Sequence, residues 1–319
     1  MTTQDFFYIH KYVDSKFASG SRIDHEEIAN EFQSILKKQF DDAQYTELLI
    51  YSGFIPDIYG NDSSEEVLFS KLVETLVAEW ARRMGFKATL LKEKSSKEDV
   101  LIKIGKDNLI VADAKSFRLG RSQKAPNVKD FLKLADIEKW MSAYDTPKGG
   151  LVTYPCQHEW QASSDVYRYC SNKNTPTIML PYKYLAYLLK YKSNYKTEDL
   201  LLLWTDFASM FPKELLKTTS GGNKSAYWEK INNAILNITR TTNSEFNIFM
   251  NDADKLINEC VQANIEYLED IIKKIKANVI KETKLLKPNE AKAELSKYKE
   301  LKETEELKKL MVNIIKFRL

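Results

Sequence analysis

Apolar residues recur at helical spacing near both ends of the chain and at strand spacing between them. From 65 to 84, Leu68, Leu72, Leu76 and Trp80 fall four residues apart, which predicts one strong amphipathic helix. A serine just before this stretch and a glycine just after it are typical of helix ends. The stripe predicts a helix that buries one face against a core.

The middle of the chain alternates strand-like and helix-like patterns. Runs rich in apolar and β-branched residues predict strands at about 87–92, 99–104, 109–115, 150–154 and 176–180. Helices are expected at about 127–141, 164–172 and 183–189. An order of helix, hairpin, helix, strand, helix and strand is typical of a mixed α/β core.

The flanking regions are predicted to be helical. After about 195 the strand patterns end, and a stripe from Ile257 to Val279 predicts one long helix, with another from Pro288 onward. We interpret the stripe as packing rather than as a membrane or partner surface, because packing is its usual role. The expected organisation is a helical N-terminal region at 1–60, a core at 61–195 and a helical C-terminal region at 196–319.

Composition narrows the class of protein. The 319 residues are 43% hydrophobic and 29% charged, which suits a soluble globular protein with an ample core. The net charge is only +3, so a nucleic-acid site must come from local patches. Three scattered cysteines and three scattered histidines argue against a disulfide framework, a zinc site or a histidine-based triad. With no signal peptide and no membrane-length apolar run, we expect a cytoplasmic protein.

The most informative segment is 108–115, an apolar run that ends in Asp113, Ala114 and Lys115. Residues two apart on a strand share a face, so Asp113 and Lys115 should point the same way. An acid and a lysine at the end of a buried strand are costly unless they serve a function. Metal-assisted phosphodiester hydrolysis needs such a pair, with an anion for Mg²⁺ and a cation for the attacking water or the phosphate.

A second acid is expected beside this pair. A strand-like run precedes it, and Gly105-Lys-Asp-Asn108 between the two runs is a turn signal. A hairpin closed there pairs Val100 with Asp113 and puts Asp99 within one register step of Asp113. Opposed residues have Cβ atoms roughly 5 Å apart, so both acids could share one cation. From the hairpin alone, an ordinary exposed hairpin with charged ends is an equal alternative.

A polar, basic loop follows Lys115 and contains Gly120 and Pro126. Arginine and lysine suit phosphates or guanine edges, and glutamine or asparagine can read adenine. A loop that leaves the catalytic strand can reach the bases beside the cut bond, although each residue could equally be a solvated loop residue. The candidate DNA contacts are Arg118, Arg121, Ser122, Gln123, Lys124 and Asn127.

Glu74 is an accessory candidate on the helix predicted at 65–84. It stands between Leu72 and Leu76, near the boundary of the apolar face. There it could bind a second metal or hold a water, while an ordinary boundary residue is the commoner use of such a position.

Several strings in the core region resemble those of the HindIII-type restriction endonucleases, which belong to the PD-(D/E)XK nuclease superfamily. The strings recur in the same order at similar spacing over roughly 50–190. They are 52–57, 68–71, Asp99-Val100, 111–119, 129–131 and Trp140. The resemblance implies a Mg²⁺-dependent type II restriction enzyme that acts as a homodimer on palindromic double-stranded DNA. It also implies a cognate methyltransferase in the same system.

Carried onto this chain, the resemblance assigns roles to five residues. It implies that Asp99 and Asp113 bind the metal, that Lys115 is the catalytic lysine and that the carbonyl of Ala114 is a further metal ligand. It adds Asp130 as a second accessory acid. The recognition loop departs from the family pattern, so the cleavage chemistry transfers more directly than the AAGCTT target.

We therefore predict an α/β fold, namely a mixed-sheet PD-(D/E)XK nuclease core with extensive helical additions and an all-α C-terminal part. The predicted function is Mg²⁺-dependent cleavage of a short palindrome. The two acids beside Lys115 favour its protonated form, so charge stabilisation suits it better than action as a base. Three alternatives stay open. They are a DNA-repair nuclease of the same superfamily, a non-catalytic DNA-binding module, and a helical scaffold whose long C-terminal helices bind partners.

Overall fold

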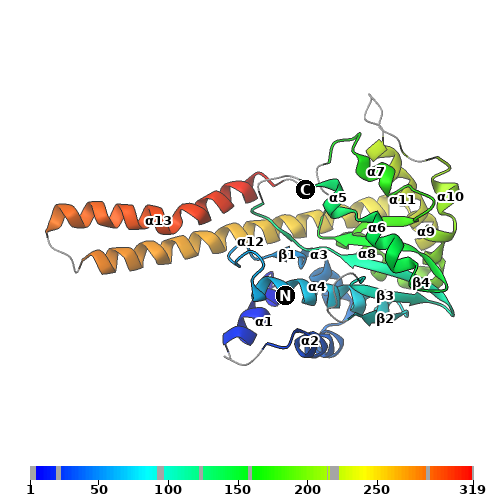
Figure 1. Cartoon of the computed structure of the whole chain (residues 1–319), viewed down its shortest axis with the longest axis horizontal. Helices are drawn as coiled ribbons and strands as arrows, with labels where there is room; N and C mark the ends of the chain where they lie inside the picture. The colour runs from blue at the N-terminus through cyan, green and yellow to red at the C-terminus, as the bar shows by residue number, and fades with distance from the viewer. Residues whose placement is uncertain are drawn as a thin grey trace.

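A five-stranded mixed sheet lies at the centre of the molecule, and two long helices extend away from it (Figure 1). The computed structural model describes residues 5–18, 23–91, 97–121, 125–156, 160–213, 215, 223–284 and 288–317. Within them, the predicted mixed α/β core and the all-helical C-terminal part are both confirmed.

The central sheet has the strand order β2-β3-β4-β6-β7. Its strands are β2 (Lys87–Leu90), β3 (Val100–Ile104), β4 (Asn108–Ala114), β6 (Pro147–Tyr154) and β7 (Thr177–Pro181). The first three strands are antiparallel, whereas β4, β6 and β7 are parallel. All five lie where the sequence predicts strands, within a few residues at each end. Strand β4, which carries the candidate pair, is therefore central and paired on both sides.

The predicted register of the β3–β4 hairpin is wrong by one residue. Val100 pairs with Ala112 rather than with Asp113, because the hairpin closes on the pair of Ile104 and Asn108, with residues 105–107 in the turn. Gly105 makes this closure possible by adopting a left-handed φ of +64°. One step beyond Val100, the register places Asp99 opposite Asp113.

A second, very short sheet lies beside the core. Strands β1 (Phe54–Ile55) and β5 (Phe117–Arg118) pair in parallel. Neither strand is predicted from the sequence, because two residues are too few to show a periodic pattern. The pair joins the loop after β1 to the segment that leaves β4.

Helices cover both faces of the sheet. Helix α4 (Ser64–Arg83) packs on β2, β3 and β4, and α6 (Leu134–Met141) packs on β4 and β6. Ser63 caps the start of α4 by accepting a hydrogen bond from the Glu66 N–H, and Gly85 follows its end with a φ of +87°. The helix predicted at 65–84 is thus confirmed.

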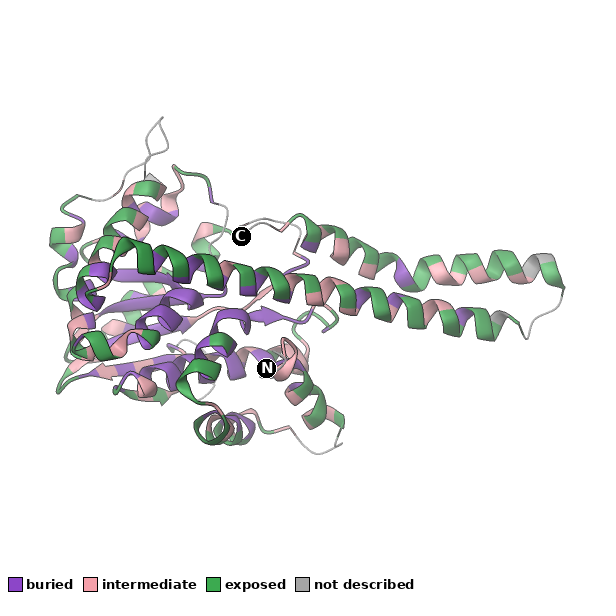
Figure 2. Cartoon of the chain, turned by 180° about the vertical axis from the view of Figure 1, so that it is seen from behind, coloured by how far each residue is buried: buried purple, intermediate pink, exposed green. Residues whose placement is uncertain are grey.

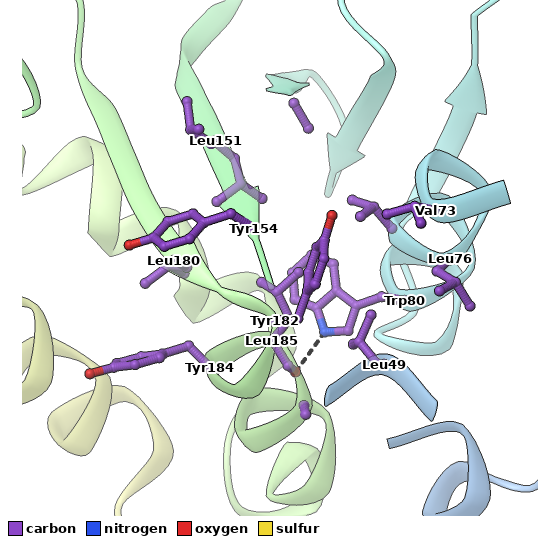
Figure 3. Packing of buried hydrophobic residues seen from close by; sticks show 14 of the residues in the cluster. Leu49, Val73, Leu76, Trp80, Leu151, Tyr154, Leu180, Tyr182, Tyr184 and Leu185 are labelled. Carbon is purple, nitrogen blue, oxygen red and sulfur yellow. Dashed lines mark hydrogen bonds between the residues drawn. The ribbon is translucent and has the colours of Figure 1, made fainter. Parts of the chain in front are cut away.

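Helix α8 (Tyr182–Lys190) closes the core next to α4 (Figure 3). The Trp80 indole of α4 donates a hydrogen bond to the Leu185 carbonyl at 2.8 Å. The packed core around it includes Tyr154 and Tyr182, both buried. The remaining helices before α4 are α1 (Tyr8–Ala18), α2 (His25–Gln39) and α3 (Asp42–Tyr51).

The single helix predicted at 127–141 is wrong, because two helices occupy that stretch. Helix α5 (Val128–Phe131) ends at Leu132, whose φ of −108° and ψ of 86° are not helical. The break lets the buried Phe131 ring pack against Trp160. The other short elements are α7 (Asp165–Tyr169), the 3₁₀ helices η1 (Lys192–Asn194) and η2 (Thr197–Leu201), α9 (Leu202–Thr205) and α10 (Phe207–Met210).

Helices α12 and α13 form an arm that projects from the core (Figure 2). The C-terminal helices are α11 (Asn223–Thr239), α12 (Asn243–Thr283) and α13 (Asn289–Ile315). Helix α12 contacts α3 and α8 at the core and continues into the arm, where α13 packs along it and returns. In the part of the chain that the structure describes, no helix has the length and apolar character needed to cross a bilayer.

Candidate active site

Asp113 and Lys115 meet at the end of β4. Their side chains form an ion pair, with 2.6 Å between Lys115 Nζ and Asp113 Oδ2. This confirms that they point the same way. Asp113 is buried, and the Lys115 side chain is one-fifth exposed. The ammonium therefore lies at the boundary between the core and solvent.

Two hydrogen bonds hold the backbone of Lys115. Its N–H donates to the Thr153 carbonyl at 2.8 Å, and its carbonyl accepts from the Tyr182 hydroxyl at 2.7 Å. Tyr182 is buried at the start of α8 and its ring stands in the core between α4 and β6 (Figure 3). The lysine is thus carried by a rigid part of the sheet rather than by a mobile loop.

Asp99 lies next to this pair, just before β3. Its Oδ2 accepts a hydrogen bond from the Ala114 N–H at 2.8 Å, so the two strands hold the carboxylate between them. Burial raises the pKa of Asp99 well above its usual range, and the charges of Glu74 and Asp113 raise it further. The Ala114 N–H and Lys115 act in the opposite direction. A cation beside these acids would relieve the repulsion.

Glu74 comes to the same region from α4. It forms an ion pair with Lys71, at 2.7 Å between Nζ and Oε2, and Lys71 also donates to the Leu91 carbonyl at 2.8 Å. Both side chains are largely buried. Among the described residues, however, no three acidic, histidine or cysteine side chains converge as a metal-binding group. The candidate ligands are therefore Asp99, Asp113 and the Ala114 carbonyl, with Glu74 nearby.

Arg118 is held by the loop that follows β1. Its guanidinium donates to the carbonyls of Pro56, Tyr59 and Gly60 at 2.9 to 3.2 Å, and pairs with Glu66 at 2.9 Å. These contacts anchor the segment that leaves β4. The assignment of Arg118 to DNA contact stays a prediction, and such contact would have to coexist with this anchoring role.

Arg121 is also packed against protein. Its guanidinium lies over the rings of Phe117 and Phe317, with centroid distances of 5.3 and 5.2 Å. Burial lowers its pKa. Just before it, the Gly120 N–H donates to both carboxylate oxygens of Asp57, each at 3.0 Å. The loop therefore starts from a fixed position.

The rest of the proposed recognition loop is only partly described. Ser122, Gln123 and Lys124 lie outside the described residues. Asn127 is exposed and caps α5 by accepting a hydrogen bond from the Lys129 N–H at 2.9 Å. Asp130 is exposed on α5, in contrast to the buried Asp113 and the half-buried Asp99.

Comparison with known proteins agrees with the chemistry of this site. The sequence profile of the HindIII restriction endonuclease family matches residues 12–311. The type II restriction enzyme HindIII of Haemophilus influenzae is 27% identical over 226 residues, which cover 70% of this chain and 68% of that enzyme. This chain belongs to the HindIII restriction endonuclease family. It is accordingly a site-specific deoxyribonuclease.

Membership of the HindIII family extends the resemblance read from the sequence. That resemblance covers about 50–190, whereas the family match also includes most of the helical regions on either side. Helices α12 and most of α13 are therefore part of the family's architecture, not an unrelated addition.

Two residues of the site carry little signal in the sequence. Lys71 is a buried lysine beside Leu68 and Leu72 on α4, and although it ends one of the strings of the resemblance, that string does not indicate its contact at the site. Tyr182 resembles the other core tyrosines, and its bond to Lys115 joins residues 67 positions apart. Contacts of this kind depend on the fold and leave no local pattern.

Proposed function

We propose that this member of the HindIII family cuts both strands of duplex DNA at a short palindromic site by Mg²⁺-dependent phosphodiester hydrolysis. The observation that carries the proposal is the meeting of Asp99, Asp113 and Lys115 at one edge of the sheet. Family membership favours this function over a DNA-repair nuclease or a non-catalytic DNA-binding module.

The donor set suits Mg²⁺. This ion binds oxygen ligands, keeps several of its waters and is commonly held by one or two carboxylates. Asp99 and Asp113 supply two carboxylates, and the Ala114 carbonyl is the third proposed ligand. The raised pKa of Asp99, caused by burial and by neighbouring acids, is the electrostatic condition that a bound cation would correct. A three-acid group is not required for such a site.

Each protein group then has a separate task. When bound, Mg²⁺ lowers the pKa of a coordinated water and neutralises charge on the scissile phosphate. Lys115, which pairs with Asp113 in the chain alone, would turn its ammonium to the phosphate and stabilise the added negative charge. Tyr182 keeps the Lys115 backbone in place.

Cutting both strands at a fixed site is simplest for a two-fold homodimer with one acidic centre per strand. A two-fold dimer presents the same surface to each half-site, so its target should be palindromic. The resemblance implies AAGCTT. It also implies an accompanying methyltransferase that protects the same sites, and the sequence composition favours a cytoplasmic location.

The loop from Arg118 to Asn127 is the proposed reader of the bases. If Arg121 or Asn127 makes a bidentate contact, its replacement by alanine should relax sequence preference and cost about 1–3 kcal/mol per lost contact. Because Arg121 also packs on Phe117 and Phe317, its variant should loosen the loop as well. Asn127 caps α5, so Asn127→Ala should also weaken that short helix, and the melting temperature of each variant is measured beside its sequence preference.

The proposal is tested by digesting a plasmid of known sequence and mapping the ends. With Mg²⁺ we expect symmetric cuts at one palindrome. With Ca²⁺ we expect specific binding without cleavage, because Ca²⁺ prefers larger and more flexible oxygen shells. Full cleavage in excess EDTA would refute the metal mechanism, and cuts at an asymmetric site would refute the two-fold target.

A further inference from the structure

Exposed apolar side chains gather along one side of α13. Tyr298 and Ile315 are each 64% exposed, Leu301 is 53% and Val312 is 48%. Together with two charged residues that lie between them, they form a series with alternating spacings of three and four residues. This is the pattern of a coiled-coil seam. This outer seam consists of Tyr298, Leu301, Glu305, Lys308, Val312 and Ile315.

The outer seam differs from the side of α13 that packs in the arm. Thr304 and Ile314 are fully buried, and Leu307 and Met311 are partly buried against the core cluster. Those positions also recur at spacings of three and four, so α13 carries two apolar stripes. One stripe is covered within the chain. The outer seam faces solvent, and a groove runs along it past Leu301 and Val312.

The outer seam is complementary to its own reversed copy. In an antiparallel helix pair centred between residues 306 and 307, Leu301 of each copy meets Val312 of the other. By the same operation Tyr298 meets Ile315. At the centre, Glu305 meets Lys308, so the two charged positions become opposite charges across the axis. A two-fold interface requires this self-complementarity.

We propose that the outer seam of α13 pairs antiparallel with the outer seam of a second copy of this chain. The apolar pairs supply the contact and the two central ion pairs set direction and register. A parallel pair would instead place Glu305 against Glu305 and Lys308 against Lys308, which the like charges disfavour. The pairing identifies the surface through which the proposed homodimer would form. Its evidence is the pattern of side chains on α13, so it does not depend on the cleavage reaction.

Such a pair would also place the two catalytic regions in relation to each other. Asn313, next to the seam, donates to the Gly120 carbonyl at 2.9 Å, so α13 touches the segment that leaves β4. At a rise of 1.5 Å per residue, Asn313 lies about 10 Å along the helix from the two-fold axis. The two copies of the contact between Asn313 and Gly120 would therefore lie about 20 Å apart along the helix direction. The dimer surface and the DNA-reading loop would share one rigid junction.

The first test is sedimentation of the full chain without DNA, so that cleavage plays no part. Wild type should be a dimer at micromolar concentration. Leu301→Glu puts two carboxylates against apolar partners and should raise the dimer dissociation constant by at least about tenfold. Ile248→Glu is the matched control, since Ile248 is 59% exposed on α12 outside the outer seam, and it should leave the constant unchanged. A monomeric wild type, or a dimer that tolerates Leu301→Glu, would overturn the proposal.

The second test fixes direction and register by charge exchange. Glu305→Lys and Lys308→Glu each place like charges across the axis, so each variant alone should dimerise more weakly. An equal mixture restores both ion pairs and should form a heterodimer with nearly wild-type affinity. Glu305 also pairs with Lys309 in its own helix at 2.7 Å, but loss of that pair would not be repaired by mixing. Failure of the mixture to recover affinity would refute the antiparallel register.

Discussion

Two regions depart from the usual distribution of side chains, in which charged groups lie in water and apolar groups are buried. One is the sheet edge, where Asp99 and Asp113 meet Lys115 at the end of β4, and the other is the outer seam of α13. They depart from it in opposite ways. At the sheet edge, Asp113 is buried and Asp99 is half-buried, and burial raises the pKa of Asp99 by disfavouring its charged form. On the arm, Leu301 and Ile315 are apolar groups left in water. Either arrangement costs free energy in the isolated chain. Each therefore indicates something outside the chain that would relieve the cost, a cation with DNA in one case and a second copy in the other.

The two regions also differ in how firmly they are held. Lys115 is fixed by hydrogen bonds to Thr153 and Tyr182, and Asp99 by one to Ala114. The outer seam lies on a projecting helix pair, which meets the core segment through contacts such as Asn313 with Gly120. Variants of the sheet edge should thus change chemistry and not assembly. Variants of the seam should change assembly and not folding.

The largest effect is expected from Asp113→Asn. The amide keeps the shape of the side chain but removes a negative charge from the metal site. Cleavage should fall by roughly 10³-fold or more, because the metal supplies both the nucleophile and charge neutralisation. The rate is measured on a plasmid with one target site under single-turnover conditions.

Its controls separate chemistry from assembly. DNA affinity in Ca²⁺ should largely survive, since phosphate and base contacts lie mostly elsewhere. The dimer dissociation constant should equal that of wild type. Turnover close to wild type in Asp113→Asn would remove the sheet edge as the catalytic centre.

Replacement of Lys115 should be nearly as damaging. Lys115→Ala removes the ammonium that pairs with Asp113, and cleavage should fall by about 10²–10³-fold, the usual cost of losing one charge-stabilising group. Lys115→Arg should recover only part of the rate, because a planar guanidinium does not reproduce a compact ammonium. If Lys115→Ala cut the plasmid at the normal rate, the lysine would be structural.

Much of the fold could be predicted because its main elements carry long periodic patterns. The apolar stripe of α4 and the apolar runs of the sheet are local signals. The β1–β5 pair could not be predicted from local patterns, since Phe54 and Phe117 lie far apart in sequence and only two residues pair on each strand. The break at Leu132 could not be predicted from them either, because the cause is the packing of Phe131 in the core.

The residues of the site also differ in whether a local pattern or a distant contact determines their position. Asp113 and Lys115 could be paired from the sequence, since a strand alternates its faces. Asp99 could be placed only within one step, because Gly105 decides how the turn closes. The contacts of Lys71 and Tyr182 could not be predicted, since each joins the residue to a distant part of the chain.

A smaller effect is expected from Tyr182→Phe, which tests Tyr182 as a positioning residue. The variant removes the hydroxyl that donates to the Lys115 carbonyl and leaves the ring in place. Loss of a buried hydrogen bond costs about 1–3 kcal/mol, and if about half of that acts on the position of the ammonium, cleavage falls by about two- to tenfold. A purely structural role would lower the melting temperature with no change in the single-turnover rate, whereas we expect that rate to fall and DNA affinity to stay constant.

The smallest effect concerns stability and tests whether the sheet edge is held at a cost. Burial raises the pKa of Asp99 above its value in the unfolded chain. Folding stability from this group is therefore fully present below the unfolded pKa and is lost as the pH rises through the folded pKa. Asp99→Asn cannot ionise, and its amide oxygen can still accept from the Ala114 N–H.

The variant should therefore melt at a higher temperature than wild type at neutral pH, by about 2–4 °C for each kcal/mol recovered. The difference should shrink as the pH falls towards about 4, where the unfolded carboxyl also takes up its proton. Asp107→Asn on the exposed hairpin turn is the matched control, and its difference from wild type should stay small at every pH. If Asp99→Asn melted below wild type at neutral pH, the Asp99 carboxylate would stabilise the fold. The sheet edge would then not be held at a cost, and the contrast drawn between it and the arm would be wrong.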